Sequence, residues 1–118
     1  MYKEKVRINK IINELLSFLL KENATSIHIN IKDSDNEVKI TILGNVKDFN
    51  KDKLNELKNK LIGSRAEGIE ELFWELVGDM NINDELNLLG TMIDESSVDL
   101  INSKCLKICV LRKKLKKG

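Results

Sequence analysis

The chain has 118 residues, of which 42% are hydrophobic and 33% are charged, and its formal net charge at pH 7 is +1. This length and composition are typical of a globular protein, and we expect a single domain over residues 1–118. The near-zero charge excludes a global electrostatic attraction to nucleic acid or to a membrane surface. No apolar stretch approaches the ~20 residues that a membrane-spanning helix needs.

The two termini and the cysteines indicate the cellular compartment of the protein. Residues 112–118 form a basic C-terminal tail, which we expect to be solvated. No secretion signal is recognised, because Asn13 and Glu14 interrupt the N-terminal apolar run. Cys105 and Cys109 would lie about 13 Å apart on one predicted strand, whereas a disulfide needs Cα atoms within ~7 Å. We therefore expect reduced thiols and a cytoplasmic protein. The lack of proline and the many Ile, Lys and Asn residues indicate a bacterium with an AT-rich genome.

The first predicted element is a helix over residues 3–22. Its apolar residues recur at helical spacing and form one stripe. The stripe consists of Ile8, Ile11, Ile12, Leu15, Leu16 and Leu19. Phe18 and Leu20 widen it, so we expect this helix to be buried over much of its circumference.

A hairpin follows, in which apolar and polar residues alternate along two strands. The first strand places Ile27, Ile29 and Ile31 on one face and His28, Asn30 and Lys32 on the other. The turn at 33–36 consists of residues that bond their own backbone. The second strand places Val38, Ile40 and Ile42 inside and Lys39 and Thr41 outside. We expect the hairpin to have one buried face.

The middle of the chain is mainly helical in its periodicity. A helix is predicted over 47–62, with Asp48 or Asn50 as its N-cap and Gly63 at its end. A joint at 63–68 leads to a strongly amphipathic helix over 69–80. Residues 83–95 fit either a helix or a strand.

Two strands close the chain. Val98 and Leu100 alternate with Asp99, and a turn is predicted at 102–104. The last strand points Leu106, Ile108 and Val110 inward. The predicted fold class is therefore α+β, a two-layer sandwich with helices on one face of a mixed or antiparallel sheet.

No residue pattern identifies a catalytic centre. The only histidine, His28, is expected on an outer strand face without a partner in the sequence. Glu70, Glu71 and Glu75 fit a solvated helix face, and the glycines are too scattered for a phosphate loop. Apolar residues on the outer sheet face, and a tryptophan beside a helical stripe, are candidates for an interface with a partner or a second copy. These candidates are Leu43, Ile101, Cys105, Cys109, Leu111 and Trp74.

Three segments resemble a known family. Residues 13–21 form a helix carrying Glu14, residues 24–42 form a hairpin, and the run 93–99 precedes two closing strands. This order resembles the Bergerat-fold ATPase domain of histidine kinases, gyrase and anti-sigma-factor serine kinases. The resemblance covers the larger part of the chain and implies a histidine-kinase-like ATPase type of sandwich.

The departures from that family concern its nucleotide site. In the family, the motif Glu orients the attacking water and an Asn four residues later binds magnesium. Glu14 matches the first position, but Phe18 occupies the second and offers magnesium no oxygen ligand. Gly44 stands near the family's adenine-binding Asp, and Val46 stands near its first glycine. The lid glycines and the terminal Gly-Thr pair are replaced at Asn83, Glu85 and Lys104-Cys105.

The resemblance and its departures imply a non-catalytic regulatory module that binds another protein. The implied partner is a sigma factor, an anti-anti-sigma factor or a second copy of the chain, with no cofactor, metal, nucleic acid or membrane. Two alternatives stay open: an active ATP-binding serine kinase of the anti-sigma type, and an unrelated α+β interaction domain. In the active case Glu14 would be the catalytic base, and Asn13, Asn45 and Asp48 would complete its site.

Overall fold

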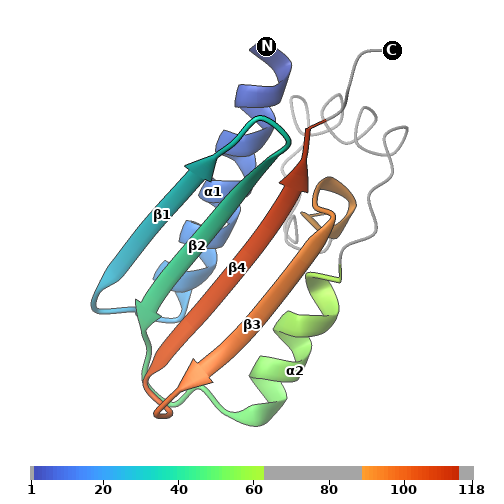
Figure 1. The fold of residues 1–118 in the computed structure, drawn as a ribbon. Helices are drawn as coiled ribbons and strands as arrows, with labels where there is room; N and C mark the ends of the chain where they lie inside the picture. Colours follow the sequence, from blue (N-terminus) through green and yellow to red (C-terminus); the bar gives the residue numbers. More distant parts are fainter. Residues whose placement is uncertain (1, 63–88, 115–118) are drawn as a thin grey trace, which may run out of the picture.

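A computed structural model of the chain describes residues 2–62 and 89–114. Its elements are α1 (Tyr2–Lys21), β1 (Ile27–Asp33), β2 (Glu37–Asn45), α2 (Lys51–Lys60), the 3₁₀ turn η1 (Gly90–Met92), β3 (Glu95–Ile101) and β4 (Cys105–Lys113). The described strands form one sheet in the order β1-β2-β4-β3, and every neighbouring pair is antiparallel. Figure 1 shows α1 and α2 on the same side of this sheet. The predicted α+β two-layer sandwich is therefore confirmed, with an antiparallel rather than a mixed sheet.

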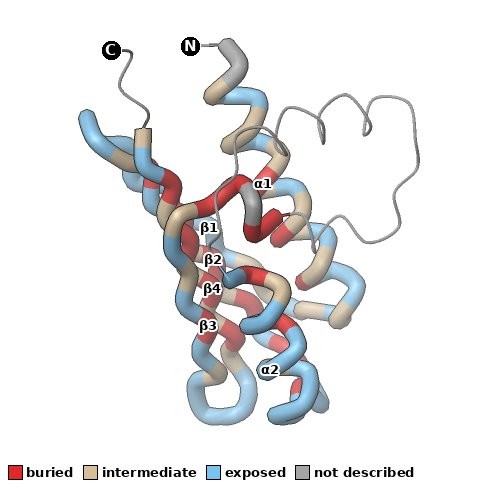
Figure 2. The backbone as a smooth tube through the Cα atoms, turned by 90° about the vertical axis from the view of Figure 1, so that its right-hand side faces the viewer, coloured by how far each residue is buried: buried red, intermediate tan, exposed pale blue. Residues whose placement is uncertain are grey.

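The core lies between the sheet and the helices, where Figure 2 shows most of the buried segments. The predicted stripe of α1 is confirmed, because Ile11, Leu15 and Leu19 are fully buried. Alternate residues of the two central strands point into the same core: Val38, Ile40, Ile42, Leu106, Ile108 and Val110. Burial of each such side chain contributes roughly 1.5–3 kcal/mol, so this layer interface is the main source of stability.

The two hairpins have matching dimensions. β1 and β3 each have 7 residues, and β2 and β4 each have 9. Because β2 pairs with β4 along the full length of both strands, an approximate two-fold axis relates one hairpin to the other. Ile31 and Val98 occupy equivalent inner-face positions in this arrangement, opposite Ile40 and Ile108 respectively.

The second helix begins at an N-cap residue, whose side chain accepts a hydrogen bond from a backbone N–H that has no acceptor within the helix. Of the two predicted cap residues, Asn50 is the N-cap, and its side-chain oxygen accepts a hydrogen bond from the Lys53 N–H at 2.9 Å. Asp48 precedes the helix with a φ of 58°, a left-handed conformation that aspartate tolerates. α2 is therefore shorter at both ends than the helix predicted over 47–62.

Two predictions of burial are wrong. Leu20, expected to widen the buried stripe of the first helix, is 58% exposed. Ile29 and Ile31 are 41% and 49% exposed, although the alternation of the strand predicted a buried face. Ile29 does lie on the inner face, since it pairs with the buried Ile42. The two isoleucines are exposed because β1 is an edge strand that the described helices leave uncovered.

The predicted solvation of the basic tail is wrong at its first residue. Arg112 lies within β4 on the inner face and is 1% exposed. Its guanidinium donates hydrogen bonds to the Glu4 carboxylate and to the Met92 carbonyl. Lys113 ends β4, and Lys114 forms an ion pair with Asp33 at 2.5 Å. Residues 115–118 of the tail lie outside the described part of the chain.

Several predictions concern residues 63–88, which also lie outside the described part. They are the joint at 63–68, the helix over 69–80, Trp74, Glu70, Glu71 and Glu75. For the ambiguous segment 83–95, the described residues form the turn η1 and then enter β3 at Glu95, so this part is neither a continuous helix nor a strand.

Candidate interaction surface

Glu14, the conditional catalytic base, is engaged within its own helix. Its Oε1 lies 2.9 Å from Lys10 Nζ, an ion pair one turn apart on α1. The residues that would complete an ATP site, Asn13, Asn45 and Asp48, are exposed on three different parts of the chain: α1, the end of β2 and the loop before α2.

Phe18 and Gly44, which stand where the family has its magnesium and adenine ligands, both have packing roles. The Phe18 ring meets Phe49 edge-on, with centroids 6.2 Å apart and an interplanar angle of 89°. Gly44 lies directly beneath α1, where an added Cβ would be 2.9 Å from Leu19 Cδ2. A side chain at this position would therefore force the buried Leu19 to change its conformation.

His28 is exposed on the outer face of β1, as predicted. Its Nε2 lies 3.4 Å from Ser26 Oγ. This contact is long for a hydrogen bond to a hydroxyl. On an open strand surface it provides no enclosed site for a substrate.

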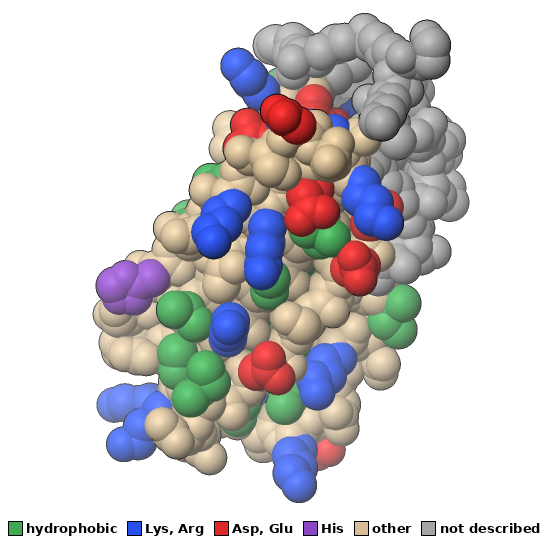
Figure 3. Space-filling view, viewed as in Figure 1, with side chains coloured by type: hydrophobic (Ala, Val, Ile, Leu, Met, Phe, Trp, Pro, Cys, Tyr) green, Lys and Arg blue, Asp and Glu red, His purple; other side chains and the backbone are tan. Residues whose placement is uncertain are grey.

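The predicted interface residues of the strands all lie on the outer face of the sheet: Leu43, Ile101, Cys105, Cys109 and Leu111. Figure 3 views this face and shows apolar side chains interspersed with lysines and acidic groups. Leu111, for example, lies between Lys39 and Glu95 on the neighbouring strands. Cys105 and Cys109 lie on the same face of one strand, as predicted, and both are free thiols. The outer face is a mixed surface rather than a contiguous apolar patch, and Trp74 lies outside the described residues.

A hollow of about 530 Å³ lies along β3 and the end of α2. It is lined by Lys58, Ile62, Glu95, Ser96, Ser97, Val98 and Asp99. Ser96 Oγ donates a hydrogen bond to the Leu61 carbonyl and so ties β3 to the end of α2. Among residues 2–62 and 89–114, no three His, Cys, Asp or Glu side chains gather as a candidate metal site.

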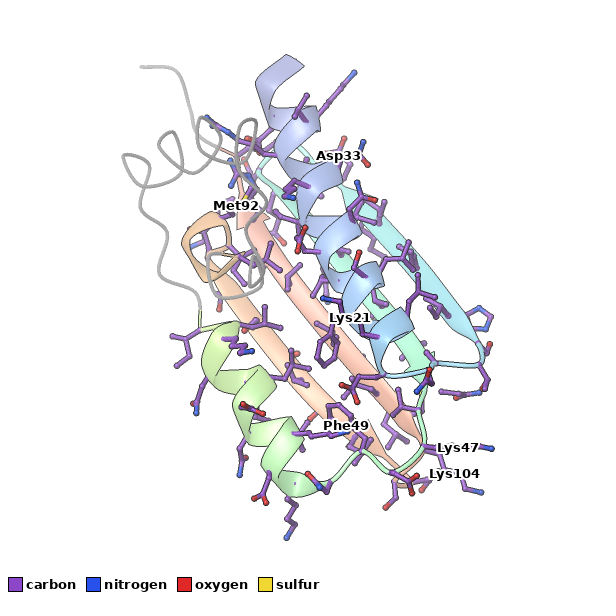
Figure 4. All side chains as sticks on the ribbon, turned by 180° about the vertical axis from the view of Figure 1, so that it is seen from behind. Lys21, Asp33, Lys47, Phe49, Met92 and Lys104 are labelled. Carbon is purple, nitrogen blue, oxygen red and sulfur yellow. The ribbon has the colours of Figure 1, made fainter. Side chains whose placement is uncertain are left out.

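The free edge of β1 is the clearest uncovered apolar feature. Ile29 and Ile31 point to the inner face and are exposed there. Val98, which is equivalent to Ile31 in the other hairpin, is only 4% exposed because α2 packs on β3. Figure 4, seen from the helix side, shows β1 extending beyond α1 on the side away from α2. Within the described chain, one edge strand is covered by a helix and the other is not.

One flank of α1 beyond its buried stripe is apolar as well. Successive residues advance by about 100° around a helix, so Leu16 and Leu20 lie on the side of α1 opposite Phe18. Phe18 meets Phe49, so Leu16 and Leu20 lie on the flank of α1 that is turned away from this contact. Leu16 is half-buried and Leu20 is exposed. We term Leu16, Leu20, Ile29 and Ile31 the β1 edge surface.

The backbone of β1 has an open side too. The Asn45 N–H donates to the Ser26 carbonyl at 2.9 Å, which continues the β1–β2 register by one pair. In an antiparallel ladder the residues bonded to one neighbour alternate, so the even-numbered residues of β1 bond to β2. The N–H and C=O groups of Ile29 and Ile31 consequently point away from the sheet, where no described strand pairs with them.

Sequence reasoning identified these residues but assigned them to the core. The available signal was the breadth of the apolar surface on α1, where Phe18 and Leu20 extend beyond the stripe on opposite sides. A helix with two apolar flanks indicates a second contact, in addition to the packing on the sheet.

The comparisons with known proteins add no relative. No protein-family model matches this chain, and neither a curated protein nor a solved structure matches it. In the part of the chain that the structure describes, no helix has the length and apolar character to cross a membrane.

Proposed function

We propose that this chain is a non-catalytic protein-interaction module that binds its partner through the β1 edge surface. The observation that carries the proposal is an open strand edge whose uncovered side chains, Ile29 and Ile31, are both large and apolar. A partner strand can bond to such an edge through its backbone and pack its side chains on the isoleucines. Proteins usually block open edges with charges, proline or bulges, and β1 has isoleucine at each inner-face position from 27 to 31.

The residues that an ATP-binding relative would use support a non-catalytic role. Phe18 packs against another ring, and its side chain has no oxygen for a cation. Gly44 lies under Leu19 and not at an accessible position. Glu14 is engaged by Lys10 in an ion pair within α1.

We further propose a degenerate histidine-kinase-like or anti-sigma-factor-like origin for the fold. The order α1-β1-β2-α2, followed later by β3-β4, supports this relationship. The antiparallel sheet with helices on one side equally suits an unrelated α+β interaction domain. Both origins lead to the same proposed function, a regulatory module in a bacterial cytoplasm that binds a protein.

Titration calorimetry with ATP and with ADP, each with magnesium, tests the non-catalytic part of the proposal. We expect no heat of binding and no shift in melting temperature. Stoichiometric binding at micromolar concentrations would contradict the proposal and would direct attention to Glu14 as a catalytic base.

Site-specific photocrosslinking tests the interaction surface. A benzoylphenylalanine introduced at Ile31 is expected to form a covalent adduct with a protein in the cell. Ile101 is the matched control, because it is a 43% exposed isoleucine on the other edge strand and on the outer face. The proposal predicts adducts from position 31 and none from position 101; equal yields at both positions, or none at either, would contradict it.

A further inference from the structure

We infer that the partner of the β1 edge surface is a second copy of this chain, joined by antiparallel β1–β1 pairing into one continuous sheet across a two-fold axis. This inference rests on the proposed function and names the partner of the same surface. It follows from the register, the charges and the helix spacing that such a pairing would have.

The inner face of β1 is self-complementary in one register. The outward-pointing backbone groups belong to odd-numbered residues, so a symmetric pairing places odd residues opposite odd residues. With Ile29 opposite Ile29 of the second copy, Ile27 lies opposite Ile31, and every inner-face isoleucine meets another. Moving the axis to Ile31 would place Ile29 opposite Asp33, and an apolar contact would be lost.

The outer face of β1 fits the same register. Lys32 of one copy lies opposite Ser26 of the other, and His28 lies opposite Asn30. No like charges therefore face each other across the strand pair, which is the condition for stable cross-strand pairing. An axis at Asn30 would instead bring Lys32 opposite His28 and leave Asp33 opposite an isoleucine. Charge and hydrophobicity thus select the register centred on Ile29.

In such a dimer the α1 helices of the two copies would not collide. α1 packs on β2, and the β2 strands of the two copies would be three strand spacings apart, about 14 Å. Helices in direct contact pack with axes about 8–10 Å apart, so the two α1 helices would be separated by the thickness of a layer of side chains. The exposed Ile29 and Ile31 of both copies would lie beneath this gap. The dimer would cover apolar side chains that the described part of the chain leaves exposed.

A second copy suits this edge better than an unrelated strand. A two-fold interface uses each apolar side chain twice, so one surface supplies both halves of the contact. The chain already joins its own hairpins in this way, because β2 and β4 pair antiparallel across an approximate two-fold axis. Pairing through β1 would repeat that arrangement between molecules and give a continuous sheet.

Sedimentation equilibrium of the full chain tests the inference. We expect a mass twice the 13.5 kDa of one chain, with dissociation on dilution. Ile29→Lys places two ammonium groups against each other on the axis and should weaken association at least ~100-fold, while an unchanged circular dichroism spectrum and melting profile show that the monomer is folded. Ile101→Lys, the same substitution at an equally exposed isoleucine of β3, should leave the dimer intact.

A second experiment mixes two variants that carry opposite charges at position 29. Ile29→Lys and Ile29→Glu should each be monomeric alone and should form a heterodimer when mixed, because opposite charges then meet on the axis. A wild type that remains monomeric up to about 1 mM, or association unaffected by Ile29→Lys, would overturn the inference. If the wild type is monomeric while position 31 still crosslinks to a different protein, self-pairing fails and the proposed function stands. Stoichiometric nucleotide binding would instead defeat the proposed non-catalytic function.

Discussion

Arg112, the last inward-pointing residue of β4, is held by Glu4 in the first turn of α1 through a bidentate ion pair. Arg112 Nε donates to Glu4 Oε2 at 2.7 Å and Nη2 donates to Oε1 at 2.8 Å. The remaining arm of the guanidinium, Nη1, donates to the Met92 carbonyl at 2.6 Å. One buried side chain therefore joins the beginning of the helical layer to the end of the sheet and to η1.

Removing the charge of Glu4 is expected to destabilise the fold. Glu4→Gln leaves the buried Arg112 guanidinium without its counter-charge, and we expect a loss of about 2–3 kcal/mol in the free energy of unfolding. The loss should stay below that of a fully buried pair, because the Glu4 side chain is 26% exposed. Urea unfolding measures the difference.

The matched control is the ion pair between Glu22 and Lys53, whose atoms are 3.1 Å apart and both partly exposed. Glu22→Gln should cost no more than about 1 kcal/mol, as is usual for exposed pairs. If Glu4→Gln and Glu22→Gln lower the free energy of unfolding by the same small amount, the buried pair contributes no more than an exposed one.

Gly44→Ala tests the close approach of α1 to the sheet. In a strand, alanine is ordinarily favoured over glycine by about 0.5–1 kcal/mol. Here the new methyl group would lie 2.9 Å from Cδ2 and 3.1 Å from Cδ1 of Leu19. We therefore expect the opposite sign, a destabilisation of about 1–3 kcal/mol in thermal or urea unfolding. In a Leu19→Ala background the same substitution should cost much less; a rise in melting temperature for Gly44→Ala alone would refute this packing argument.

Ser103→Gly is expected to stabilise the protein. Asn102 and Ser103 have φ values of 53° and 58°, and the Lys104 N–H donates to the Ile101 carbonyl at 3.1 Å. Two consecutive left-handed residues with this bond define a type I′ turn, which favours Asn-Gly. Removing the Cβ of Ser103 should therefore raise the unfolding free energy by about 1 kcal/mol. Asn102→Gly should gain less, since asparagine tolerates this conformation; the reverse order in melting temperature would contradict the turn assignment.

The sequence predicted those parts of the fold that depend only on the periodicity within one segment. Helical spacing identified α1, and alternation identified both hairpins and their inner faces, such as Ile40 and Ile108. Alternation gives the face to which a side chain points, but the cover over that face depends on strand order. Ile29 and Ile31 were placed in the core for this reason, because nothing within the strand itself indicates that β1 is at an edge.

Long-range partners explain the remaining errors. Arg112 looked like the start of a solvated tail, and its burial depends on Glu4, 108 residues earlier. The same applies to the α1 residues of the candidate surface. Leu16 and Leu20 recur at helical spacing, and this spacing fits a buried stripe as well as an exposed flank. The long-range contact of Phe18 with Phe49 shows which flank of α1 is packed and which is left open.

Hydrogen exchange at the backbone amides of β1 tests the central claim most directly. The amides of Ile29 and Ile31 point away from the sheet, whereas those of His28 and Asn30 bond to β2. We predict that Ile29 and Ile31 exchange at least ~tenfold more slowly in concentrated than in dilute protein, while His28 and Asn30 remain protected in both. Fast exchange of Ile29 and Ile31 at every concentration would contradict the assignment of β1 as a self-pairing edge.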